Sequence, residues 1–173
     1  MILIHTALQC EAQCIIEYYK LKKTNSQPKI YSNEDILVLI GGIGKDNTLN
    51  KLTHIFTTYS ITKAINLGIA GCSDLNTPIG SFFTTLNHLI DIEYKELVTV
   101  DLAQTKNNND NMLYDMEASY FLEVVQKYLT KENIEILKIV SDHLDNTRPN
   151  KESIKSLIRF HLDKIVAIVD INK

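Results

Sequence analysis

The sequence predicts an α/β fold in which helices flank a central, largely parallel sheet. Short apolar runs that are typical of buried strands alternate along the chain with longer segments whose apolar residues recur at helical spacing. Several strand-like runs lead directly into a helix through glycine or acidic residues, as at Glu11 and Gly44. The 173 residues, 45% of them hydrophobic, match one domain with a substantial core, and we expect a single domain over residues 1–173.

The N-terminal half is expected to begin with a buried strand over residues 2–8. The following apolar stripe predicts a helix from about residue 12 to residue 23; it consists of Cys14, Ile15, Tyr18 and Tyr19. Two short strands, a second helix and another strand are expected next, at 29–31, 36–40, about 46–59 and 62–67. This alternation indicates strand–helix–strand units, which place parallel strands side by side.

The C-terminal half is less regular before residue 112. A long or bent strand is expected over 78–90 and another over 97–102, followed by a polar, Asn-rich loop over 106–111. The stripe of Phe121, Leu122, Val125 and Leu129 then predicts a helix over 118–129. A strongly hydrophobic strand over 134–140 and a final helix over 151–168 complete the predicted order.

Composition excludes several classes of protein. The net charge of −3, from 18 basic and 21 acidic residues, provides no basic surface for nucleic acid. No apolar run approaches the roughly 20 residues of a membrane span, and the apolar start lacks the basic region of a signal peptide. Cys10 and Cys14 have no second pair at zinc spacing, so we expect small core residues and no metal site. We therefore expect a cytoplasmic protein with reduced thiols.

An acidic pair surrounds Met116 where the Asn-rich loop meets the predicted helix. Asp115 and Glu117 are the residue types that cap a helix start, and a carboxylate there gains about 0.3–1 kcal/mol from the helix dipole. Local sequence alone therefore favours two capping acids, and Asp115 keeps that interpretation.

Glu117 has a second interpretation, because two other acids occupy equivalent places. Glu11 follows the first strand and Asp142 follows the last strong strand. If these strand ends share one edge of the sheet, the three carboxylates meet over one pocket floored by Gly68 and Gly71. A carboxylic acid and a carboxylate base on either side of a sugar suit hydrolysis through an oxocarbenium-like transition state.

The glycine-rich segment 41–45 also joins a strand to a helix. Such a turn can bind an anion through backbone amides, or it can simply be a tight connection; both interpretations remain open. Its glycine spacing and the absence of Ser or Thr after Lys45 exclude a Walker loop. No dinucleotide fingerprint is present either, because the third glycine comes too early.

Five motifs in order cover most of the chain: Ala7-Leu8-x-x-Glu11, Gly42-Ile43-Gly44-Lys45-Asp46-Asn47, Asn66-Leu67-Gly68-Ile69-Ala70-Gly71, Asp115-Met116-Glu117-Ala118 and Val140-Ser141-Asp142. Together they resemble the purine nucleoside phosphorylase/nucleosidase superfamily, and most of all its 5′-methylthioadenosine/S-adenosylhomocysteine nucleosidases. The resemblance implies a three-layer phosphorylase/hydrolase-like fold with a mixed, mostly parallel central sheet flanked by helices.

The resemblance also implies roles for single residues. Glu11 matches the acid that polarises the attacking water, and Asp142 matches the acid that protonates N7 of the departing purine, with Ser141 orienting it. Met116 matches the residue that packs on the ribose, and Glu117 the residue that accepts hydrogen bonds from the ribose hydroxyls. By the same resemblance the substrate-binding set includes Ile69, Ala70, Gly71 and Lys138.

The chain departs from the family pattern at several places. It is shorter between about residues 79 and 111, where family members carry segments that cover the purine and build much of the dimer interface. The aromatic expected after the strand at 97–101 is replaced by Leu102-Ala103-Gln104, and the one expected after Asp145 is absent from 146–149. Ile69 stands where a small hydroxyl residue is expected, and Lys138 where an arginine is expected.

The resemblance implies hydrolysis of the N-glycosidic bond of a purine nucleoside of the methylthioadenosine or S-adenosylhomocysteine type. The only arginines are Arg148 and Arg159, so the arginine clamp that suits a phosphate co-substrate has no candidate near 41–45 or 68–71. We expect a homodimer that uses no metal or organic cofactor. The alternatives are a catalytically weak nucleoside-binding or assembly protein of the same fold, and a purine nucleoside phosphorylase.

Overall fold

The computed structural model describes residues 1–173 except 25–26, 88, 90, 108, 146–148 and 172–173. Its centre is a mixed, mostly parallel sheet with strand order β2-β3-β4-β1-β5-β10-β6-β7, and β9 pairs with both β5 and β8. The four central strands run parallel to one another; they are β4 (Ile36–Ile40), β1 (Ile2–Thr6), β5 (Lys63–Cys72) and β10 (Ile134–Asp142). The predicted fold class is therefore confirmed.

Shorter strands extend the sheet on both sides. The antiparallel strands β2 (Lys22–Lys23) and β3 (Ile30–Ser32) continue it beyond β4. The other edge and a branch on β5 are formed by β6 (Phe82–Thr84), β7 (Glu93–Tyr94), β8 (Leu97–Thr99) and β9 (Leu113–Asp115).

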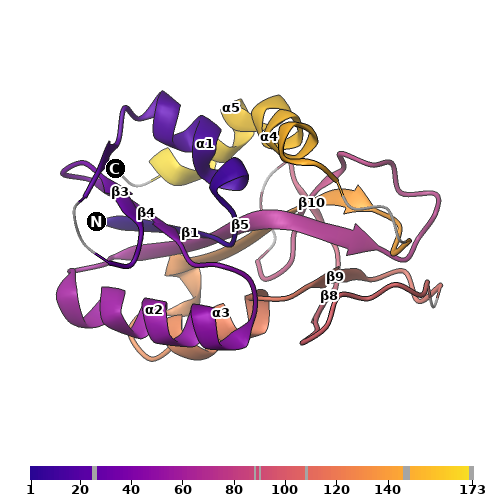
Figure 1. Ribbon diagram of the computed structural model, residues 1–173, viewed down its shortest axis with the longest axis horizontal. Helices are drawn as coiled ribbons and strands as arrows, with labels where there is room; N and C mark the ends of the chain where they lie inside the picture. Colours follow the sequence, from indigo (N-terminus) through magenta and orange to yellow (C-terminus); the bar gives the residue numbers. More distant parts are fainter. Residues whose placement is uncertain (25–26, 88, 90, 108, 146–148, 172–173) are drawn as a thin grey trace.

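Helices cover both faces of the sheet, which gives three layers (Figure 1). One face carries α1 (Gln9–Tyr18), α4 (Lys151–Phe160) and α5 (Leu162–Asp170), and the other carries α2 (Lys45–Thr58) and α3 (Ala118–Val125). A 3₁₀ turn, Lys131–Asn133, leads into β10. Alternate residues of β1 serve the two cores, since Ile2 and Ile4 pack towards α1 while Leu3 packs towards α2 and α3.

Several predicted boundaries are wrong. The first helix begins three residues earlier than expected and ends at Tyr18, because the chain turns at Lys20, whose φ is 51°, and then enters β2. The final helix is interrupted at His161. The strand expected over 78–90 is reduced to Phe82–Thr84; positions 88 and 90 lie outside the described residues.

Parallel pairing brings the carboxyl ends of the central strands to one edge. The residues that follow β1 and β4, and the last residues of β5 and β10, therefore lie next to one another. The motif-bearing segments 7–11, 41–45, 69–72 and 141–142 all reach this edge. Within the part of the chain that the structure describes, no helix is long and apolar enough to span a membrane.

Candidate active site

A cavity of about 520 Å³ opens at the carboxyl edge of the sheet. Glu11, Glu117 and Asp142 all line it, so the structure brings the three predicted acids together. The predicted site residues Met116, Ser141, Ile69, Ala70 and Gly71 line the same cavity. The rest of its lining is mostly apolar and comes from Ala7, Leu8, Ile43, Val100, Leu102, Ala103, Gln104, Tyr114, Asp115, Leu144, Pro149 and Ile154.

Glu11 lies in the first turn of α1 and is almost completely buried. Its Oε2 accepts the Leu8 N–H at 2.8 Å, and its Oε1 accepts the Ile69 N–H at 3.1 Å. The first bond ties the carboxylate to the start of its own helix, and the second ties it to the end of β5. Burial raises the pKa of Glu11 to about 7, although both backbone N–H groups and Lys138 act in the opposite direction.

Glu117 is the N-cap residue of α3 and is buried. Its Oε1 accepts the N–H of Gly44 at 2.9 Å, and Gly44 is itself the N-cap residue of α2. A carboxylate therefore occupies the positive end of α2, at the glycine-rich turn for which the sequence left anion binding open. Burial raises the pKa of Glu117 above its usual range.

Asp142 ends β10 and is partly exposed to the cavity. The Ser141 hydroxyl donates to its Oδ2 at 2.6 Å, and the Leu144 N–H donates to its Oδ1 at 3.0 Å. Gly71 makes room for this arrangement, because a methyl group on it would lie 2.4 Å from Leu144 Cδ2 and 3.0 Å from Asp142 Oδ1. Ser141 thus contacts Asp142 directly.

Lys138 does not reach the cavity, in contrast to its expected place among the substrate-binding residues. Its side chain is buried below the floor and forms a 2.7 Å ion pair with Asp115. Asp115 Oδ2 also accepts the Ala118 N–H at 2.9 Å, so the predicted helix cap is present. The cap interpretation missed the ion pair, because nothing in the local sequence connects residue 115 with residue 138.

The charged side chains that line the cavity are all acidic. Of the side chains that line it, Glu11, Asp115, Glu117 and Asp142 are acidic, and among the described lining residues there is no lysine, arginine or histidine. The nearby lysines are engaged elsewhere: Lys51 Nζ donates to Asn47 at 3.0 Å and to the Gly41 carbonyl, and Lys45 lies over the Tyr120 ring. Such a cavity stabilises a positively charged group and repels an anionic ligand.

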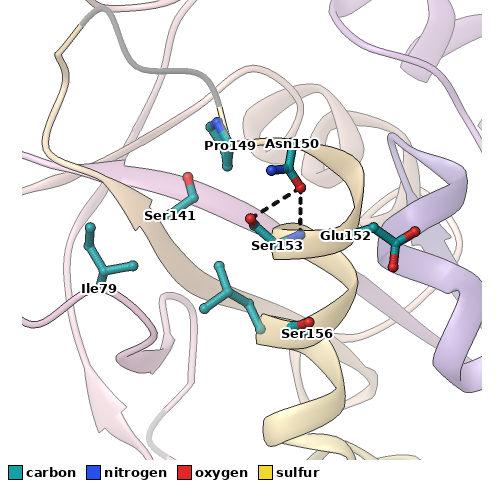
Figure 2. A pocket seen from close by; sticks show the side chains of 8 residues that line it. Ile79, Ser141, Pro149, Asn150, Glu152, Ser153 and Ser156 are labelled. Atoms are coloured by element: carbon teal, nitrogen blue, oxygen red, sulfur yellow. Dashed lines mark hydrogen bonds between the residues drawn. The ribbon is translucent and has the colours of Figure 1, made fainter.

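A second hollow of about 630 Å³ adjoins the first and shares Ser141 and Pro149 with it. Figure 2 shows Ile79 and the start of α4 on either side of it. Asn150 Oδ1 accepts the Ser153 N–H at 2.9 Å and so caps α4. Only Glu152 is charged among the described residues that line this hollow, so the acids gather in the first cavity. The segment 146–148, where the sequence lacks the expected aromatic, lies outside the described residues.

Several lining residues had no signal in the sequence. Gln104 and Leu102 belong to the irregular segment after β8, and apolar residues in such segments follow no period. Tyr114 is the one aromatic among the described lining residues, and its hydroxyl bonds with Asp110. Its strand, β9, was missed altogether, because three residues are too few for a pattern to be recognised.

The three-layer arrangement, with an acid-lined cavity at the carboxyl edge of the sheet, defines an α/β fold. No protein-family model and no curated protein sequence matches the chain. Solved structures do match, and the resemblance read from the five motifs is confirmed at the level of the fold.

Three of these structures illustrate the similarity. The Helicobacter pylori futalosine hydrolase superposes with a TM-score of 0.81 at 14% identity, over 98% of this chain and 97% of that chain. The corresponding values for the H. pylori 5′-methylthioadenosine/S-adenosylhomocysteine nucleosidase with butyl-thio-DADMe-Immucillin-A are the same. The Streptococcus pneumoniae nucleosidase in complex with 8-aminoadenine gives 0.78 at 11% identity, over 97% and 98%.

Proposed function

We propose that the protein hydrolyses the N-glycosidic bond of a purine nucleoside of the methylthioadenosine or S-adenosylhomocysteine type. The observation that carries this proposal is the convergence of Glu11, Glu117 and Asp142 on one cavity that has no lining cation among its described residues. Its fold neighbours include nucleosidases, one of them with bound 8-aminoadenine, which supports a purine as the leaving group.

Each carboxylate has one task in this reaction. Glu11 takes a proton from the water that attacks the anomeric carbon, and its pKa of about 7 suits a general base near neutral pH. Asp142 donates a proton to N7 as the C–N bond breaks and its electron pair leaves with the base. Glu117 has one oxygen bonded to Gly44, and its other oxygen accepts from the ribose hydroxyls while Met116 packs on the sugar.

The same cavity favours water over phosphate as the nucleophile. A developing oxocarbenium ion is stabilised by the surrounding carboxylates, whereas a phosphate anion would be repelled by them. The positive end of α2 is already bonded to Glu117. Arg159, the arginine within the described residues, pairs with Glu17 on the outer helices at 3.1 Å.

The test is a base-release assay with methylthioadenosine and S-adenosylhomocysteine, run with and without phosphate. We expect adenine release that does not depend on phosphate and that falls by about 10²-fold or more in Asp142→Asn, since general acid catalysis supplies roughly 10²–10⁴-fold. Asp35→Asn is the matched control, because Asp35 is exposed next to the start of β4 at the opposite edge of the sheet.

Other outcomes would favour the alternatives. Release only with phosphate would identify a phosphorylase. A rise in melting temperature on addition of the nucleoside, without base release, would identify a nucleoside-binding protein. The absence of both base release and a rise in melting temperature would favour an assembly role.

We also propose that the protein is cytoplasmic and forms a homodimer. Its three cysteines are free, which suits a reducing compartment. At the cavity rim Leu102 is 82% exposed and Ile43 is 49% exposed, and large apolar side chains in such positions favour cover by another chain. Sedimentation of the purified protein measures this directly, and a monomer at micromolar concentration would contradict it.

A further inference from the structure

One buried ammonium group lies beneath the three-carboxylate cavity. Lys138 is 1% exposed and stands on β10, opposite Gly68 of β5 in the register of the two strands. A methyl group on Gly68 would lie 2.9 Å from Glu11 Oε1 and 3.7 Å from Lys138 Nζ. The Glu11 carboxylate and the Lys138 ammonium therefore sit over the same backbone position, on the same side of the sheet.

The direct partner of this ammonium is Asp115, which connects three elements. Its Oδ2 pairs with Lys138 of β10 and accepts the Ala118 N–H at the start of α3. Its Oδ1 accepts the Thr99 hydroxyl of β8 at 2.7 Å, and the Thr99 hydroxyl in turn accepts the Ser119 N–H at 2.9 Å. Met116 and Glu117 directly follow Asp115 at the end of β9, so this network fixes the position of both residues at the cavity.

We propose that Lys138 is a positioning residue, whose ion pair holds Asp115 and through it the Met116–Glu117 segment, and whose ammonium, placed over Gly68 beside the Glu11 carboxylate, serves as the counter-charge of that acid. The inference rests on the proposed function only for its catalytic consequence. It assigns Lys138 a place below the reaction centre, buried and outside the lining of the cavity.

The charged groups around Lys138 support its role as the counter-charge of Glu11. Burial lowers the pKa of Lys138, but the surrounding carboxylates, Asp115 foremost, raise it above its usual value, so the ammonium stays charged. Glu11 faces Lys138 from α1 and Glu117 faces it from the start of α3. His5 of β1 is also buried near it, and burial followed by the Lys138 charge lowers the pKa of His5 to about 3. Lys138 is thus the ammonium that offsets the buried acids.

The other charged groups near Glu11 do not replace Lys138. Cys10 adjoins it on α1, and burial followed by the Glu11 charge raises the pKa of that thiol. Asp142 lines the same cavity and carries the same sign as Glu11. Without Lys138, the Glu11 carboxylate would face only neutral or acidic groups among these neighbours, and its pKa would rise further.

The experiment is a pH titration of Glu11 by ¹³C NMR of protein labelled at the glutamate side-chain carboxyl carbons, with the signal assigned by its loss in Glu11→Gln. In Lys138→Met we expect the midpoint to rise by about one pH unit or more, because a nearby opposite charge shifts a carboxyl by about 1–3 units. Lys138→Arg should restore a midpoint close to that of the wild type.

Lys63→Met is the matched control. Lys63 is also a buried sheet lysine, but it lies at the start of β5 and donates to the Ile168 carbonyl at 2.6 Å, far from the cavity. The Glu11 midpoint should not move in this variant. An unchanged midpoint in folded Lys138→Met, or an equal shift in Lys63→Met, would overturn the inference.

A titration of Asp115→Asn and the pH profile of base release complete the test. If Lys138→Met does not fold, Asp115→Asn replaces it; removing a negative charge should then lower the Glu11 midpoint, and a rise or no change would count against the network. The pH profile of base release should shift together with the NMR midpoint. A midpoint that shifts in a protein without base-release activity would support the role of Lys138 while rejecting the proposed function.

Discussion

At the scale of single residues, Glu11 shows how opposing interactions set the character of a buried acid. Two backbone N–H groups and the Lys138 charge favour its ionised form, while removal from water favours its neutral form. Desolvation is the larger effect, and it leaves the pKa at about 7 instead of the ordinary 4.5. The carboxyl group can therefore gain or lose a proton close to physiological pH, which a general base requires.

This pKa predicts the pH profile of base release. Because the reaction needs the carboxylate form of Glu11, whose pKa is about 7, kcat/KM should fall on the acidic side of the profile, by up to tenfold per pH unit. On the alkaline side it should fall again, as Asp142 loses the proton that it donates to N7. Glu11→Gln should lose at least about 10²-fold at every pH. Initial rates between pH 5 and 9 measure both effects. A constant rate from pH 5 to 7, or an active Glu11→Gln, would show that another group is the base.

At the scale of elements, β5 is the strand on which the site depends. The sequence predicts a strand over 62–67 that ends at a glycine motif, but the strand continues through this motif to Cys72. The two glycines are therefore strand residues that leave space for neighbours from other elements: Gly68 for Glu11 of α1, and Gly71 for Asp142 and Leu144. Close approach was predictable from the residue type, but the groups that approach were not.

Gly68→Ala tests this close approach. The new methyl group would lie 2.9 Å from Glu11 Oε1, and that carboxylate is held by two N–H groups, so it must leave its position. We expect base release to fall by at least about tenfold, because small displacements of a catalytic group are costly. The backbone at Gly68 is an ordinary strand, so far-ultraviolet circular dichroism should be unchanged.

Gly44→Ala provides the comparison. A methyl group there meets nothing within 4 Å, but the φ of +88° makes alanine unfavourable. We expect a loss of about 1 kcal/mol in the free energy of unfolding, which Gly68→Ala should not show by this route. If Gly68→Ala kept full activity, the Glu11 carboxylate would not need its present position.

The elements that sequence patterns failed to predict have a common physical origin. The break between α4 and α5 arises from His161, whose Nε2 lies 2.6 Å from the Gly80 carbonyl and whose ring stacks on Phe82. The ion pair of Lys138 with Asp115 likewise connects positions far apart in the sequence. Local periodicity reports which face of an element is buried, and it contains no information about such long-range polar contacts.

At the scale of the whole molecule, the fold was the more predictable part. The order of strands and helices and the buried runs at 36–40 and 134–140 already required a sheet covered on both faces, because those strands alternate between the two cores. That Glu11 and Asp142 share one edge of the sheet followed from the parallel pairing of β1, β5 and β10. Glu117 reaches the same cavity after β9, a strand that pairs antiparallel with β5 and that the sequence did not predict. The covering segments between about residues 79 and 111 were poorly predicted, because short strands there pair with partners distant in sequence.

The same buried groups make the stability of the whole protein depend on pH in two opposing ways. The folded protein raises the pKa of Glu11 to about 7, so it binds a proton that the unfolded chain has already lost, and stability falls as the pH rises from 4.5 to about 7. The folded protein lowers the pKa of His5 to about 3, and stability is therefore lost as the pH falls below 6.5. A stability curve of the wild type alone would mix these contributions.

Comparison with Glu11→Gln separates them, since His5 is present in both proteins. The free energy of unfolding of the variant, relative to the wild type, should increase by about 3 kcal/mol between pH 4.5 and pH 8, at 1.36 kcal/mol per pKa unit. The constant part of the difference can have either sign, because glutamine offers one acceptor to the two N–H groups at Leu8 and Ile69. Urea unfolding across this pH range measures the change, and two parallel curves would show that Glu11 titrates in the folded protein as it does in the unfolded chain.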